Sequence, residues 1–251
     1  MNTLGNTSHW YKNAIYFYLH FQYNGWFIFC LLGLFFFFLE QKKINLKKEL
    51  VSSFFKLMLI SCILTTCLSF LWIKPGVFVY IFACIGAIIQ VIALYKFRMI
   101  ISTVINDLHT KLTPFIIRLL TFTYTLFVCK IVLQLVTSIP YFAELTSQIL
   151  DFVIGYLHLT FLGIVSISLF IFLQEFGLIK LSKFWVVVYL VGFILSEILI
   201  FYKGFCNWQQ LSIINNYYLI LMLISSLIPI AVLGVFIKNI KLIPSTHSKP
   251  Q

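Results

Sequence analysis

Long apolar runs alternate with short polar stretches along the whole chain. Each run is about 20 residues or longer, the length that an α-helix needs to cross the hydrocarbon core of a bilayer. The runs are continuous rather than alternately apolar and polar, so they predict helices and not the strands of a β-barrel. The pattern predicts an all-α, polytopic bundle of seven transmembrane helices near residues 14–39, 53–72, 77–95, 113–135, 147–174, 183–203 and 216–240.

The stretches between these runs are short. Residues 73–76, Ile-Lys-Pro-Gly, separate the second and third runs and predict a tight turn within an antiparallel hairpin. Between the third and fourth runs, apolar residues recur at helical spacing from Phe97 to Leu108, which predicts a short helix lying on the cytoplasmic membrane surface. No connection is long enough for a soluble domain, so we expect residues 1–251 to form a single polytopic domain.

Composition and charge distribution predict an oriented membrane protein. The chain is 61% hydrophobic and only 10% charged, which excludes a water-soluble globule. Its net charge of +11 does not indicate nucleic-acid binding, because the Lys and Arg residues lie mainly in alternate loops. Residues 42–56, 96–118, 180–183 and 238–249 hold most of them. The bias predicts an outside amino terminus and a cytoplasmic carboxyl terminus in a bacterial inner membrane, with the lipid bilayer as the main partner.

A few polar side chains lie inside the predicted spans, mostly toward the outer side. The bilayer core offers no water to satisfy such groups, so each is costly unless another helix or a ligand supplies a partner. These residues therefore predict an outer-facing polar pocket: His20, Gln22, Asn24, Lys130, Asp151, His158 and Glu197.

Helical spacing assigns these residues to faces. Tyr16, His20 and Tyr23 fall on one stripe of the first span, with Asn24 beside His20, so aromatic rings frame an imidazole. On the fifth span, Asp151 and His158 share a face with Gly155. Lys130 is the cation at this depth, and Asp151 and Glu197 are the anions, so an ion pair is expected.

Two segments of the chain have a recognisable pattern: residues 9–26, His-Trp-Tyr-Lys-Asn-Ala-Ile-Tyr-Phe-Tyr-Leu-His-Phe-Gln-Tyr-Asn-Gly-Trp, and residues 155–159, Gly-Tyr-Leu-His-Leu. They resemble a family of bacterial polytopic membrane proteins that is distantly similar to subunit I of haem-copper oxidases and nitric oxide reductases. His20-Phe21-Gln22-Tyr23 resembles the oxidase motif His-Phe-His-Tyr, with Gln22 in place of the second histidine. The resemblance covers only the later half of the family pattern, without copper-site histidine pairs.

The resemblance implies a redox-linked haem site. It makes His20 the ligand of the haem iron and places Tyr16, Tyr23, Asn24 and His158 around the cofactor. A rival interpretation is a transporter or channel in which Lys130, Asp151, His158 and Glu197 form a proton or substrate path. A third is a structural partner of another membrane subunit. The residues alone leave these three hypotheses, and whether the protein is an enzyme, open.

Overall fold

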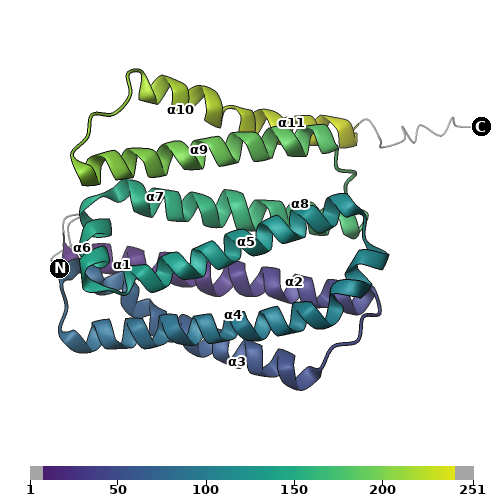
Figure 1. Cartoon of the computed structure of the whole chain (residues 1–251), viewed down its shortest axis with the longest axis horizontal. Helices are drawn as coiled ribbons and strands as arrows, with labels where there is room; N and C mark the ends of the chain where they lie inside the picture. Colours follow the sequence, from purple (N-terminus) through teal and green to yellow (C-terminus); the bar gives the residue numbers. More distant parts are fainter. Residues whose placement is uncertain (1–7, 241–251) are drawn as a thin grey trace, which may run out of the picture. The chain divides into compact units, whose positions relative to one another are not determined.

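The computed structural model describes residues 8–240, and these residues form helices joined by short turns (Figure 1). Seven helical segments are long and apolar enough to cross a membrane. They confirm the predicted all-helical, multi-pass fold: His9–Gln41, Lys48–Ile73, Val77–Lys111, Pro114–Thr137, Leu150–Glu175, Lys183–Gln209 and Tyr217–Ile240.

Three of the spans change helix type part-way. The first consists of α1 (His9–His20), the π-helix η1 (Phe21–Phe27) and α2 (Ile28–Gln41). The second consists of α3 (Lys48–Thr65) and the 3₁₀-helix η2 (Thr66–Ile73). The fifth consists of α7 (Leu150–His158), the π-helix η3 (Leu159–Val165) and α8 (Ser166–Glu175). Each change alters which backbone carbonyls the helix itself satisfies.

The third span is a single helix, α4, from Val77 to Lys111. The prediction of a separate surface helix after the third span was therefore wrong. No proline or glycine interrupts the chain between residues 87 and 111, so nothing breaks the helix. Its buried stripe also continues through Phe97, Val104 and Leu108, and Phe97 stacks on Phe54 of α3 with ring centroids 5.1 Å apart.

The chain forms two compact units, residues 1–169 and 170–251, and each is described by itself. In the first unit, α3 and α4 pack along each other as the predicted hairpin, joined by residues 74–76 (Figure 1). Gly86 permits this contact, because a Cβ atom there would lie 2.7 Å from Cβ of Leu64 and 2.8 Å from the backbone nitrogen of Thr65. The close approach of these two backbones explains why position 86 has no side chain.

The first unit also contains α5 (Pro114–Thr137) and a short helix, α6 (Pro140–Gln148), that was not predicted. Thr113 caps α5 by accepting a hydrogen bond from the backbone of Ile116, and proline follows at the first helical position. Ala143 of α6 packs with Leu71 and Ala83 in a small apolar cluster. α6 thereby fixes the connection between α5 and α7 against η2.

The second unit pairs α9 (Lys183–Gln209) with α10 (Tyr217–Ser225) and α11 (Leu227–Ile240). A Cβ atom at Gly192 of α9 would lie 2.9 Å from Cβ of Leu227, so glycine allows these helices to approach closely. Pro229 lies in the first turn of α11, just after the break between α10 and α11 at Ser226. Its ring nitrogen has no hydrogen to donate to the preceding turn, which explains the interruption of the last span.

Candidate functional site

Lys130 occupies the centre of a buried polar cluster in the first unit. It lies on α5, and its exposed fraction is 0%. Its ammonium group donates hydrogen bonds to Oδ1 of Asn24 at 2.5 Å and to Oε1 of Gln134 at 2.8 Å. The ring of Tyr156 is centred 5.5 Å from Nζ, within the range of a cation–π interaction. The ammonium group thus has two neutral amides as partners where we expected a carboxylate.

Asn24 connects the ammonium group to the imidazole of His20. The Nδ2 group of Asn24 lies 3.2 Å from Nδ1 of His20, and the hydroxyl group of Tyr156 donates to Oδ1 of Asn24 at 3.3 Å. Both the oxygen and the nitrogen of the amide therefore have partners, and these partners determine its orientation. Three helical spans meet in this arrangement, which we call the lysine cluster: His20, Asn24, Lys130, Gln134 and Tyr156.

Both ring nitrogens of His20 have partners. Nε2 lies 2.9 Å from the carbonyl oxygen of Cys62, which can only accept, so Nε2 carries the hydrogen. Nδ1 then has the lone pair and accepts from Asn24. The hydrogen bonds all run in one direction, from Lys130 through Asn24 and His20 to Cys62.

The change of helix type in the second span makes the Cys62 carbonyl available. In a regular α-helix this oxygen would accept from the backbone N–H of Thr66, but that N–H bonds to the carbonyl of Ile63 instead. The freed oxygen accepts from His20 and from the hydroxyl groups of Thr65 and Thr66, at 3.3 and 3.2 Å. The irregular backbone is therefore tolerated because side chains satisfy it.

The second π-helix begins in the same way as the first but has different contacts. Tyr-Leu-His occurs at residues 18–20, directly before η1, and again at residues 156–158, directly before η3. Nδ1 of His158, however, is buried and has no hydrogen-bond partner among residues 8–240. Sequence inspection missed this short likeness, although the two tripeptides and the glycine five residues after each histidine could have indicated it.

The other predicted site residues are distributed over both units. Tyr16 packs edge-on against Trp72, whereas Tyr23 packs edge-on against Phe161 with centroids 4.4 Å apart. Gln22 lies in η1 but is not in the hydrogen-bonded network described above. Asp151 lies in the first turn of α7 and Glu197 on α9 of the second unit. Both carboxylate oxygens of Glu197 are buried without a partner among the described residues.

A haem at His20 does not fit these contacts. An iron ligand must present a ring nitrogen with a free lone pair, but His20 has a hydrogen on Nε2 and uses the lone pair of Nδ1. The side chain is only 6% exposed. Tyr16 and Tyr23, expected to pack on a porphyrin, pack on Trp72 and Phe161 instead. His20 is better described as the residue that orients Asn24.

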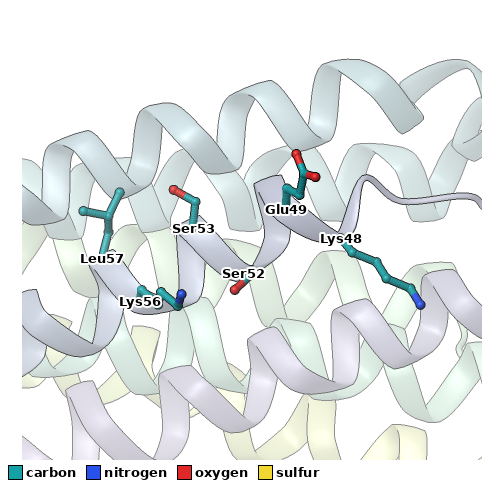
Figure 2. A pocket seen from close by; sticks show the side chains of 6 residues that line it. All are labelled: Lys48, Glu49, Ser52, Ser53, Lys56 and Leu57. Atoms are coloured by element: carbon teal, nitrogen blue, oxygen red, sulfur yellow. The ribbon is translucent and has the colours of Figure 1, made fainter.

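A second polar region is a groove of about 570 Å³ along the beginning of α3 (Figure 2). Its lining side chains all come from this one helix and fan out around it rather than converging on a point. They are Lys48, Glu49, Ser52, Ser53, Lys56 and Leu57. Such an open surface provides no enclosed binding site.

Lys74, in the turn between the second and third spans, forms an ion pair with Glu144 of α6. Its Nζ lies 2.7 Å from Oε1, and both side chains are exposed. The hydrogen bond, and then the charge of Glu144, raise the pKa of Lys74 above its ordinary value. The pair connects α6 to the hairpin of α3 and α4 at the surface.

Comparison of the chain with protein-family models, with curated proteins and with solved structures finds no match. The resemblance to haem-copper oxidase subunits therefore stays a prediction. The lysine cluster has to be interpreted from its own chemistry.

Proposed function

We propose that the protein is a proton-linked membrane transport protein in which Lys130 binds and releases the proton. The observation that carries this proposal is a fully buried ammonium group with neutral amide partners. Two amides can satisfy N–H donors, but they cannot neutralise the charge. A group in this state is suited to changing its protonation when its surroundings change.

The free energies of burying and of stabilising the Lys130 ammonium group favour a site that can change its protonation over a rigid structural contact. A lysine charge at the centre of a membrane helix costs about 2.5–3.5 kcal/mol on insertion scales and more in simulations. A hydrogen bond to a charged group contributes about 1.5–3 kcal/mol, and a desolvated cation–π contact about 2 kcal/mol. Together the three contacts of Lys130 offer about 5–8 kcal/mol, which lies between the cost on insertion scales and the value of about 10–17 kcal/mol that simulations give for an arginine. Moving one partner removes about a third of this stabilisation and changes the balance.

The placement of Lys130 supports access from one side. The Lys and Arg bias of the loops favours an outside amino terminus, in a bacterial inner membrane. In that orientation α5 ends at the outer surface, and Lys130 lies seven residues before the end of this helix at Thr137. At 1.5 Å per residue, the ammonium-bearing position is roughly 10 Å from that end. In this orientation the proton-binding position is nearer to the outer end of α5 than to its inner end.

The test is proton movement into liposomes that contain the purified protein. A potassium diffusion potential drives the proton, and an enclosed pH-sensitive dye reports its entry. We expect flux with the wild-type protein and flux at the level of protein-free liposomes with Lys130→Met. Lys56→Met is the matched control, because Lys56 is an exposed lysine on α3. Wild-type protein without flux, or Lys130→Met with full flux, would refute the proposal.

A further inference from the structure

We infer that Asn24, Gln134 and Tyr156 form a binding site for a small primary ammonium group, which Lys130 fills as a ligand tethered to the protein. An R–NH3⁺ group has three hydrogens to place. The site presents two amide oxygens, at 2.5 and 2.8 Å from Nζ, and one aromatic ring centred 5.5 Å away. The number and type of these contacts match an ammonium group.

The amide of Asn24 is oriented by a contact other than the one with the cation. Asn24 could present either end of its amide, but its Nδ2 group is held by His20, so Oδ1 faces Lys130. His20 is in turn held by the carbonyl of Cys62. A site whose oxygens are held by other bonds does not need to reorganise when an ammonium group binds, which favours recognition.

The exchange of Lys130 for an external ammonium ion balances in charge. Lys130 releases one proton to the aqueous phase on one side of the membrane and becomes a neutral amine that can leave the site. An external R–NH3⁺ ion then occupies it, so the site has one positive charge before and after. This exchange step rests on the proposed function and names a primary ammonium ion as the substrate class. The recognition step does not depend on proton transport and can be tested separately.

Chemical complementation of Lys130→Ala tests the recognition step. The substitution removes three methylene groups and the ammonium group, and propylammonium supplies the same atoms. We expect propylammonium chloride to raise the unfolding temperature of Lys130→Ala in detergent saturably and by several degrees. We expect no rise with propan-1-ol, which has similar size but no charge, or with tetramethylammonium, which has no N–H group. Wild-type protein, in which Lys130 competes for the site, should respond much less than Lys130→Ala at the same concentrations.

The acceptor residues provide the matched control. In the double variant Asn24→Leu with Lys130→Ala, the response to propylammonium should disappear. If Lys130→Ala does not fold alone, the yield of monodisperse protein solubilised with propylammonium or with propan-1-ol gives the same comparison. Equal responses to the two compounds, or a response that survives Asn24→Leu, would overturn the inference. Complementation without proton flux in the wild type would refute the proposed function and leave the ammonium site standing.

Discussion

The two π-helices of the first unit begin after the same tripeptide and have opposite chemistry. Before η1, both ring nitrogens of His20 are used, and Asn24 four residues later bonds to it. Before η3, Nδ1 of His158 is buried without a partner among the described residues, and Leu162 takes the place of Asn24. A similar local sequence thus contributes to a satisfied polar network in one span, whereas in the other it leaves one imidazole nitrogen without a partner among residues 8–240.

The difference shows that the partner helices, and not the π-helix itself, decide what each histidine does. The carbonyl that holds His20 comes from the 3₁₀ transition of the second span. Tyr156, which precedes His158 by two residues, instead bonds toward Asn24 and contributes to the first site. The second span and the fifth span both contribute contacts to the lysine cluster, and of the two π-helices η1 contains a residue of this cluster, Asn24.

The largest expected effect is that of removing the acceptor at Asn24. Asn24→Leu removes one of the two amide acceptors of the buried Lys130 ammonium group and leaves Nδ1 of His20 without its partner, so we expect a loss of about 3–5 kcal/mol in the free energy of unfolding. The matched change in the second π-helix is Thr160→Val. The Thr160 hydroxyl donates a hydrogen bond to the backbone carbonyl of Tyr156 in the same span, so a loss of about 1 kcal/mol is expected. Denaturant unfolding in detergent measures both, and equal losses would contradict the comparison.

The next largest effect is the difference in stability loss between substitutions of the two histidines. His20→Leu leaves the Nδ2 group of Asn24 without its acceptor and removes a donor from the Cys62 carbonyl. We expect it to lower the free energy of unfolding by about 1–3 kcal/mol. His158→Leu removes a buried nitrogen that has no partner among the described residues, so it should cost less or stabilise the protein. The unfolding midpoints of the two variants compare them directly. A larger loss for His158→Leu would mean that His158, and not His20, makes the stabilising hydrogen bonds.

The surface ion pair of Lys74 and Glu144 should have a smaller, pH-dependent effect. Because the pKa of Lys74 is raised in the folded protein, the stabilisation is present below the ordinary lysine pKa of about 10.4 and is lost as pH rises through the raised value. We expect the unfolding temperature of the wild type to fall by roughly 1 °C more than that of Lys74→Met across this range. Identical pH profiles would show that the pair contributes nothing.

Replacing His20 by leucine should not change the absorption spectrum of the protein in the Soret region. Protein expressed with haem available is expected to have the same absorption spectrum in the Soret region as His20→Leu, because both ring nitrogens are already bonded. Spectra of the oxidised and reduced proteins test this. A Soret band in the wild type that is lost in His20→Leu would restore the haem hypothesis.

The spans could be predicted from sequence because run length alone decides whether a helix crosses the hydrocarbon. α6 could not, since its nine residues lack the length and hydropathy that mark a span. The turn at residues 74–76 was predictable from proline and glycine, whereas the continuation of α4 beyond the third apolar run is also supported by the packing of Phe97 against Phe54, which the sequence does not show. Elements that depend on contacts with other helices are the ones that sequence patterns miss.

The residues of the lysine cluster were predicted in part. His20, Asn24 and Lys130 stood out because polar groups are costly in apolar runs. Their partners did not, because spacing shows which face a residue occupies but not which helix it meets. The helical wheel also fails beyond His20, where the π-helix changes the residues per turn, so Tyr16 and Tyr23 contact different partners.

The most direct test of the lysine cluster is a pair of double-mutant cycles on Lys130. One cycle combines Lys130→Met with Asn24→Leu, and the other combines it with Asp151→Asn. The contacts of Lys130 predict a coupling free energy of at least about 1.5 kcal/mol with Asn24, because the double variant replaces both partners by apolar groups. They predict none beyond error with Asp151. Strong coupling to Asp151 and none to Asn24 would mean that the ammonium group is held by an ion pair, and the amide site would be contradicted.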